Sequence, residues 1–242
     1  MFSGVWKTYE KDLGHTSSPA LKDLSFSVGE RETLGLIGAN GAGKSTCIRL
    51  LMDFIRPDQG HIEISGKNVR NNQLRHDIGY LPEIASFPPN LTILDLILFV
   101  ARAHGLARKL MRERSAYLLQ LVGLWEARKK PVRNYSKGMQ QRAGFVLALL
   151  HDPSFLILDE PMSGLDPIGR AQIAALVADL KSQGKTILFC SHILEDVDRL
   201  ADRLLILHKG EKRFEGTATE LSQTYGTSSI VDGFLKIIGM DA

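Results

Sequence analysis

A glycine-rich stretch at residues 38 to 46, GANGAGKST, contains residue types that bind phosphate groups. Gly38 is followed after four residues by Gly43, Lys44 and Ser45, between the apolar run TLGLI and the helical pattern CIRLLMDF. Glycines let backbone N–H groups curl around phosphate oxygens, and a helix N-terminus adds positive potential. The stretch therefore predicts a phosphate loop, in which the lysine reaches the β- and γ-phosphates and the serine hydroxyl binds Mg²⁺.

A pair of carboxylates follows a second apolar run, in FLILDE at residues 155 to 160. Adjacent charges at a strand end usually form a solvated edge when they stand alone. Beside a phosphate loop the opposite reading is favoured, because Asp159 can hold Mg²⁺ directly or through water, as in other nucleotide hydrolases. Glu160, one residue on, is then the candidate that polarises the attacking water.

The elements that position these groups differ in hydrophobic pattern. Runs with almost no polar residue are typical of parallel strands covered on both faces, and they occur at 33–38, 155–158, 186–190 and 204–207. Alternating runs at 21–28 and 61–65 predict half-exposed antiparallel strands. The segment from about Asn90 to Val132 has no strand signal and predicts several helices, and one or two more are expected after Gly216.

These patterns predict an α/β protein with one domain over residues 1–242. It has a phosphate-loop (RecA-like) parallel-sheet core, an antiparallel β subdomain and a helical insert at about 90–132. The 242 residues are 44% hydrophobic, which favours a globular chain, and 30 basic against 27 acidic side chains argue against an electrostatic nucleic-acid binder. The longest apolar run, at 93–101, is far shorter than the roughly 20 residues of a spanning helix, so the chain is expected to be soluble by itself.

Several further motifs, in matching order and spacing, resemble those of the nucleotide-binding subunit of an ATP-binding-cassette (ABC) transporter. NYSKGMQQR at 134–142 is similar to the family's signature loop, and SGLD at 163–166 matches its D-loop. Tyr9, in WKTYE, is similar to the aromatic residue that stacks on adenine. His192, in CSH at 190–192, follows a strand where the family has its switch histidine.

The resemblance implies an ATPase that hydrolyses MgATP at two composite sites of a head-to-tail dimer. Ser136 and Gly138 of one cassette then face the γ-phosphate of ATP on a second copy of the chain or on a homologous cassette. Glu160 is the implied base, His192 the implied contact to the γ-phosphate, and Ser45, Glu83 and Asp159 the implied support for Mg²⁺. The nucleotide-binding set comprises Tyr9, Gly38, Asn40, Gly41, Gly43, Lys44, Ser45, Thr46, Ser136 and Gly138.

Two departures from the family pattern bear on this reading. The usual signature LSGGQ is replaced by YSKGM, which changes the first, third and fifth positions to Tyr135, Lys137 and Met139. This form resembles the branch of exporters whose ATPase and membrane subunits are separate chains. It implies a transmembrane permease as partner and a location on the cytoplasmic face of the cell membrane. In the loop after YLP the family's glutamine is replaced by Glu83, which adds a negative charge near the γ-phosphate.

Two other readings keep parts of this chemistry. A soluble cassette ATPase would hydrolyse ATP without a membrane partner, but the exporter-like YSKGM and the absence of a coiled-coil insertion before the signature argue against it. A nucleotide-gated scaffold would bind ATP without turnover, and the presence of Glu160 and His192 argues against that.

Three local expectations concern residues outside these motifs. Cys47 follows the phosphate loop in the first turn of a helix, a position that lowers a thiol's pKa, but the flanking Ile48 and Leu51 predict partial burial. Slow alkylation is therefore expected, and bound MgATP should retard it further. In the basic stretch ARKLMRER at 107–114, Leu110 and Met111 are expected to pack inward while the arginines face water. The histidines outside the motifs show no ligand spacing and are expected at the surface or hydrogen-bonded: His61, His76, His104, His151 and His208.

Overall fold

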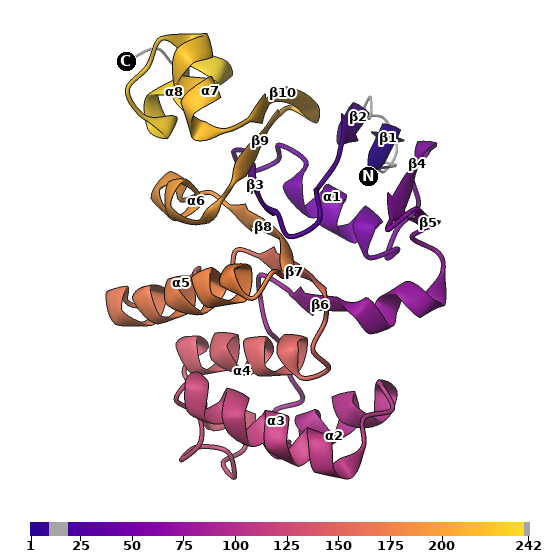
Figure 1. The fold of residues 1–242 in the computed structure, drawn as a ribbon, viewed down its shortest axis with the longest axis vertical. Coiled ribbons are helices and arrows are strands. Elements are labelled where there is room, and N and C mark those ends of the chain that lie inside the picture. The colour runs from indigo at the N-terminus through magenta and orange to yellow at the C-terminus, as the bar shows by residue number, and fades with distance from the viewer. Residues whose placement is uncertain (10–18, 240–242) are drawn as a thin grey trace, which may run out of the picture. The chain divides into compact units, whose positions relative to one another are not determined.

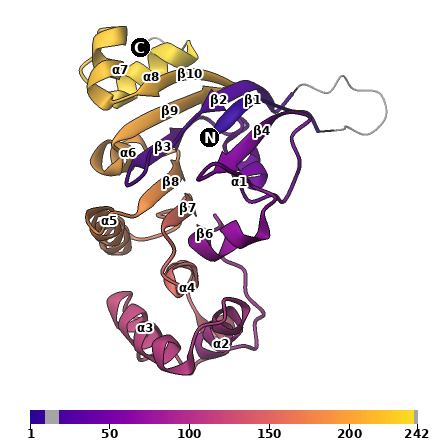
Figure 2. The same ribbon diagram turned by 45° about the vertical axis from the view of Figure 1, so that its right-hand side comes forward.

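The computed structural model describes residues 1–9 and 19–239 and divides into two compact units. Unit 1 combines Met1–Leu74 with Thr186–Ala242, and unit 2 is the intervening Arg75–Lys185. Figures 1 and 2 show the ribbon from two directions. The chain therefore leaves unit 1 and returns to it, while the expected single ATPase domain over residues 1–242 stays a prediction.

Unit 1 contains the predicted antiparallel sheet, in the order β2-β1-β4-β5. Its strands are β1 (Phe2–Lys7), β2 (Leu21–Phe26), β4 (Gln59–Ile64) and the short β5 (Lys67–Asn68). The buried positions of β2 are Leu21, Leu24 and Phe26, and the ring of Phe26 stacks on that of Phe2 with centroids 4.5 Å apart. One face of the strand is thus apolar, as the alternating sequence predicts.

A second group of strands in unit 1 is mainly parallel. β3 (Thr33–Ile37) pairs in parallel with β8 (Thr186–Ser191) on one side and β9 (Arg203–His208) on the other, and β10 (Glu211–Gly216) is antiparallel to β9. All five residues of β3 are buried, which explains its unbroken apolar sequence. The helices of this unit are α1 (Lys44–Leu51), α6 (Leu194–Leu200), α7 (Ala218–Tyr225) and α8 (Ile230–Ile238).

Unit 2 contains a parallel strand pair and the predicted helices. β6 (Ile78–Leu81) pairs with β7 (Phe155–Asp159), and α4 (Lys137–Leu149) packs between this pair and the helices α2 (Ile93–Ala103) and α3 (Arg108–Leu121) (Figures 1 and 2). The short 3-10 helices η1 (Asn72–Asp77) and η2 (Val132–Asn134) precede β6 and α4, and α5 (Pro167–Ser182) follows β7. Helices α2 and α3 lie within the stretch of about 90–132, whose role as a separate helical subdomain stays a prediction.

The start of α2 is fixed by a capping box. The Thr92 hydroxyl accepts a hydrogen bond from the Asp95 N–H at 3.2 Å, and the Asp95 carboxylate accepts one from the Thr92 N–H at 2.8 Å. Ile93, Leu96 and Ile97 point into the unit and are buried. Within the described ranges 1–9 and 19–239, no helix has the length and apolar composition needed to cross a membrane.

The basic helix α3 differs from the sequence expectation. Leu110 is 44% exposed rather than packed inward, and Met111 is half-buried. Arg114 instead turns inward, and its guanidinium donates to the carbonyls of Leu150 at 2.7 Å and Leu149 at 2.8 Å. The prediction that all arginines of this helix face water was wrong, because Arg114 donates to carbonyl groups at the C-terminal end of α4.

Candidate functional site

The predicted phosphate loop lies between β3 and α1 in unit 1. Lys44 is only 8% exposed, and its ammonium group donates to the Gly38 carbonyl at 2.6 Å and lies 3.5 Å from that of Ala39. Helix α1 begins after Gly43, whose side chain cannot cap the helix, so its first N–H groups receive no side-chain acceptor at that position. The loop thus gathers one cation and several backbone donors at the same place.

Close packing explains the glycines of this loop. A Cβ at Gly38 would lie 2.7 Å from the Leu207 carbonyl oxygen, and one at Gly43 would lie 2.8 Å from that of Ala20. Gly43 also has a φ of 112°, which residues with a side chain rarely adopt. Gly41 differs, because no atom lies within 4 Å of its Cβ position. The loop is therefore held tightly by unit 1 on one side and is open at Gly41.

The remaining loop residues divide by exposure. Asn40 and Ser45 are exposed, so the serine hydroxyl is accessible to a metal ion, whereas Thr46 is 8% exposed. The hydroxyl groups of Tyr9 and Thr46 lie 3.3 Å apart, and Tyr9 is 38% exposed. The structure thus brings the aromatic residue of WKTYE to the phosphate loop, although the two are 37 positions apart in the sequence.

His192 lies at the same end of the parallel strands as the loop. It follows β8, which runs parallel to β3 with Ile37 opposite Ser191, so Gly38 and His192 leave the two strands side by side. The carboxyl ends of parallel strands meet at one edge, where ligand sites form in open α/β sheets. His192 is exposed there, and its contact with a γ-phosphate stays a prediction.

In unit 2 the candidate carboxylates also follow the carboxyl ends of neighbouring parallel strands. Leu81 in β6 is opposite Leu158 in β7, so Glu83 emerges beside the end of the strand that carries Asp159 and Glu160. Asp159 and Glu160 are each 7% exposed, whereas Glu83 is exposed. Glu160 has a left-handed backbone with a φ of 47°, an unfavourable conformation for a residue with a side chain. Such conformations are often found at functional sites.

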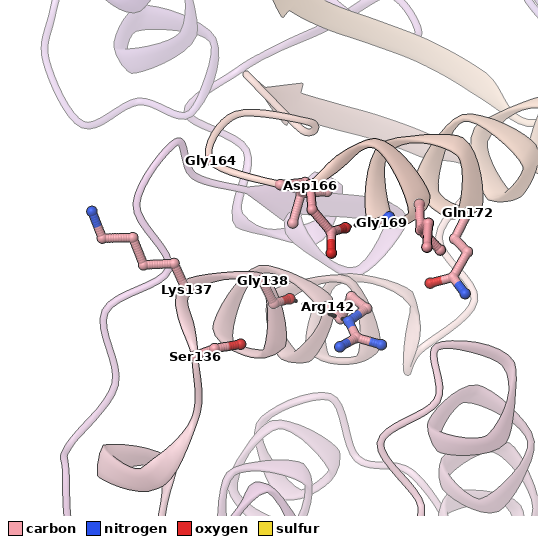
Figure 3. A pocket seen from close by; sticks show the side chains of 10 residues that line it. Ser136, Lys137, Gly138, Arg142, Gly164, Asp166, Gly169 and Gln172 are labelled. Atoms are coloured by element: carbon pink, nitrogen blue, oxygen red, sulfur yellow. Dashed lines mark hydrogen bonds between the residues drawn. The ribbon is translucent and has the colours of Figure 1, made fainter.

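The signature residues border a hollow of about 440 Å³ in unit 2. Ser136 is the N-cap of α4, and its hydroxyl accepts from the Met139 N–H at 3.2 Å. The opposite wall is the D-loop with the start of α5, where the Asp166 carboxylate accepts from the Gly169 N–H at 2.7 Å. Figure 3 shows Ser136 and Gly138 on one side of this hollow and Asp166 and Gln172 on the other.

These residues have the donor set that MgATP requires. The phosphate loop offers a lysine and uncapped helix N–H groups to phosphate oxygens, and Ser45 offers an exposed hydroxyl. Mg²⁺ commonly keeps several waters and takes one or two carboxylates together with phosphate oxygens, a role that Asp159 and Glu83 fit chemically. ATP and Mg²⁺ are thus consistent with the side chains at the predicted positions.

Two residues near the signature loop were not identified from the sequence. Gln141 is 5% exposed, and its amide donates to the carbonyl of Pro161 at 3.3 Å. Arg142 donates to the carbonyls of Val122 at 2.9 Å and Gly138 at 3.3 Å. The periodicity of α4 was a usable signal, because Gln141 lies one turn before the buried Phe145 and therefore on the same helix face.

The cysteine beside the phosphate loop is more buried than expected. Cys47 has no exposed surface, and Cys190 in β8 is equally inaccessible; neither forms a disulfide. Burial raises the pKa of the Cys47 thiol far above its ordinary value, and this effect exceeds the opposite influence of the backbone hydrogen bond at the helix start. The expectation of partial burial and a lowered pKa was therefore wrong.

Comparison with known proteins identifies the family. Residues 21–163 match the family model described as ABC transporter. An uncharacterized ABC transporter ATP-binding protein of Synechocystis is 43% identical over 204 residues, which cover 84% of this chain but 58% of the relative. The ABC-type transporter ATP-binding protein EcsA of Bacillus subtilis is 35% identical over 238 residues and is covered to 96%, as is this chain. The length match thus differs between relatives.

Solved structures agree with this match. A structure described as the ATP binding subunit of an ABC transporter has a TM-score of 0.88 and 30% identity, with 98% of both chains covered. A dimeric ATP-binding cassette in a post-hydrolysis state, bound to ADP and Pi, has a TM-score of 0.81 and 25% identity over 89% of this chain and 97% of that one. The α/β architecture with a parallel and an antiparallel sheet is confirmed. The chain belongs to the ABC transporter family and carries the family's ATP-binding cassette.

Proposed function

We propose that this chain binds and hydrolyses MgATP at two composite sites of a head-to-tail dimer, and that a separate membrane subunit uses the cycle for export. The observation that carries the proposal is the buried Lys44, held among loop carbonyls at the uncapped start of α1 with His192 at the neighbouring strand end. This arrangement provides fixed positive charge for the β- and γ-phosphates before any nucleotide arrives.

The catalytic roles follow from burial and charge. Glu160 is nearly enclosed, so it is suited to take a proton from the attacking water, and His192 donates a hydrogen bond to the γ-phosphate. Asp159, Ser45 and Glu83 are the proposed holders of Mg²⁺, which would neutralise charge on the phosphate oxygens.

The open hollow beside the signature loop supports the dimeric part of the proposal. Ser136 and Gly138 are accessible in it. The hollow is lined by two cations, the exposed Lys137 and Arg142, and one carboxylate, Asp166, so its net charge is positive and suits phosphate. A relative of similar fold is a dimer with hydrolysis products bound. We therefore infer that ATP held by the partner cassette fills the hollow, and that the loss of its γ-phosphate weakens the dimer.

Exposed apolar side chains of unit 2 support a membrane partner. Ile84 is 77% exposed and Phe99 is 72% exposed, and Leu91, Leu94 and Leu98 are each exposed by more than a third. Leu94 and Leu98, four positions apart in α2, share one helix face, and a contiguous exposed apolar surface marks a site for another protein. Because the signature YSKGM resembles that of exporters, we propose that the partner docking on this surface is an export permease on a separate chain.

Membrane fractionation tests the proposed partner. Phe99→Asp places a charge on the exposed face of α2, so it should release the chain from native membranes while the ATPase rate of the purified chain stays within about twofold, a change worth less than 0.5 kcal/mol. Phe54→Asp is the matched control, because Phe54 is 57% exposed but lies in unit 1. A wild-type chain that is wholly soluble in cells with its natural neighbours would instead indicate a soluble cassette ATPase.

A further inference from the structure

A hydrogen bond inside unit 2 connects the signature helix to the turn that carries Glu160. Gln141 lies in α4 five residues after Ser136, is 5% exposed, and donates from its side-chain nitrogen to the carbonyl oxygen of Pro161 at 3.3 Å. Pro161 directly follows Glu160. A polar side chain is expensive to bury unless it has a partner, so this amide is held at the carbonyl by its apolar surroundings.

The turn that receives this bond needs support. Glu160 has the left-handed φ of 47°, and its carbonyl accepts from the Ser163 N–H at 3.0 Å, which closes a turn with Pro161 at the second position. A strained backbone persists only where its surroundings fix it. Ser163 and Pro161 act within the turn itself, whereas Gln141 fixes it from a rigid helix on the other side.

A second contact runs along the same path. A Cβ at Gly138 would lie 3.3 Å from a methyl carbon of Leu165, so the first turn of α4 is in contact with the D-loop. The segment from Glu160 to Leu165 is therefore held against α4 near both ends, by a hydrogen bond and by packing. Both contacts lie within one turn of α4, because Gly138 and Gln141 are three positions apart in the same helix.

We propose that Gln141 is a positioning residue for Glu160: its bond to the Pro161 carbonyl sets the direction of the carboxylate and links it to the signature loop of the same chain. The inference rests on the proposed role of Glu160 as base. When the ATP of the partner cassette contacts Ser136 at one end of α4, the first turns of the helix transmit that contact to the base of the other composite site. Each cassette thereby couples the two sites through its own α4.

Steady-state ATPase kinetics of two variants test the role of the amide. Gln141→Leu keeps the volume but removes the donor, so kcat should fall roughly tenfold, because a small displacement of a catalytic group costs this much or more, while KM for ATP changes less than about twofold. The controls are Gln120→Leu and Gln120→Glu at an exposed position of α3, and both should match the wild type.

The pH profile of Gln141→Glu separates positioning from a structural role. The introduced carboxyl group is buried, so it binds a proton more readily than an exposed one, and only its protonated form has an O–H that donates to the Pro161 carbonyl. Activity of this variant relative to the wild type should therefore rise as the pH falls from 8 to 6. A ratio that stays constant over this range would show that the donor at Gln141 has no effect on the base.

Dimerisation provides the second readout. In the Glu160→Gln background, Gln141→Leu should leave the ATP-dependent dimer intact, because binding at Ser136 and Gly138 is not altered. Loss of the dimer together with kcat would mean that Gln141 maintains the signature helix and would overturn the proposal, and so would an unchanged kcat for Gln141→Leu. If the wild-type chain itself fails to hydrolyse ATP, the proposed function fails and this inference with it. If the wild type does hydrolyse ATP, a negative result for the variants overturns only the role proposed for Gln141.

Discussion

Two helix N-termini of this chain face anions in the proposed mechanism, and they are prepared differently. Helix α1 in unit 1 starts without a side-chain cap and has the buried Lys44 beside it. Helix α4 in unit 2 starts with the exposed Ser136, whose hydroxyl already accepts from the Met139 N–H, and it borders an open hollow. The first site is organised to bind phosphate by itself, whereas the second needs a nucleotide presented by another chain.

The largest expected effect on turnover comes from a substitution that blocks the chemical step but leaves nucleotide binding at α1 intact. Glu160→Gln should reduce turnover by about 10²-fold or more, since an amide can orient a water but cannot take its proton. Nucleotide binding should persist, so the variant should accumulate as an ATP-bound dimer in size-exclusion chromatography at high protein concentration. Hydrolysis at the wild-type rate would remove Glu160 as base.

A charge at the α4 site should affect the dimer but not the binding of nucleotide to one chain. Gly138→Asp places a carboxylate where a phosphate is proposed to dock, and like charges brought together at an interface cost several kcal/mol. We expect dimerisation with ATP and turnover to fall by at least about tenfold, while ATP binding by the monomer, measured by calorimetry, stays unchanged. Ala103→Asp adds the same charge to an exposed position of α2 and serves as control.

A substitution in the phosphate loop at α1 should act earlier, at the binding of ATP to the single chain. Lys44→Ala removes the buried ammonium of the phosphate loop, so the monomer itself should lose affinity for ATP. Gly138→Asp and Lys44→Ala would be indistinguishable in both assays if the two helix N-termini were equivalent. That result would break the distinction between them.

The two units are also expected to respond differently to acid. In unit 2 the rings of His104 and His151 stack with centroids 3.8 Å apart, and His76 meets His104 edge-on at 5.5 Å. Burial, and then the neighbouring His104, lowers the pKa of His151 to about 4, and burial also lowers the pKa of His104. The unfolded chain therefore binds protons that the folded chain does not, and stability should fall as the pH drops from about 6.5 toward 4.

Thermal unfolding measured between pH 7.5 and 5 checks this prediction. His151→Gln keeps a donor toward the Ile78 carbonyl, which the ring nitrogen of His151 contacts at 3.0 Å, but it cannot titrate. Its midpoint temperature should therefore depend less on pH than that of the wild type, by a few degrees over this range. His61→Gln in unit 1 is the control, and a slope equal to that of His151→Gln would contradict the prediction.

The smallest expected effect concerns the thiol behind the α1 site. Because Cys47 has no exposed surface, its alkylation in the native chain should be at least about tenfold slower than in denaturant, where thiolate formation is normal. Added MgATP should change this slow rate less than about twofold, since access is limited by opening of the core. Mass-spectrometric labelling measures this rate. Rapid modification of the native chain would contradict the prediction and show that the α1 helix opens readily.

Sequence reasoning predicted the local elements that carry the candidate residues. The phosphate loop, the strand that feeds it and the carboxylates after FLIL are local patterns, and the structure has each as a strand end or strand–loop–helix unit. Long-range contacts were not readable in the same way. The inward turn of Arg114 depends on carbonyls 35 and 36 positions away, and the stacking of His104 on His151 depends on how two helix ends meet.

The missed Gln141 illustrates the same limit at the candidate site. Its helical position predicts a buried face, but its partner is the carbonyl of Pro161, and no residue type in the sequence marks a carbonyl as an acceptor. The burial of Cys47 was underestimated for a related reason, because the electrostatic effect of a helix start can be read locally whereas the packing around the helix cannot.

The left-handed backbone of Glu160 also constrains how this chain can change. A non-glycine residue in that conformation costs on the order of 1 kcal/mol or more. Glycine would relieve the cost at this position, but it would remove the carboxylate, so random mutation cannot improve stability here without removing the proposed base. Selection for heat resistance should therefore leave this position untouched and find its improvements elsewhere, while a lineage that no longer needs turnover would be free to place glycine there.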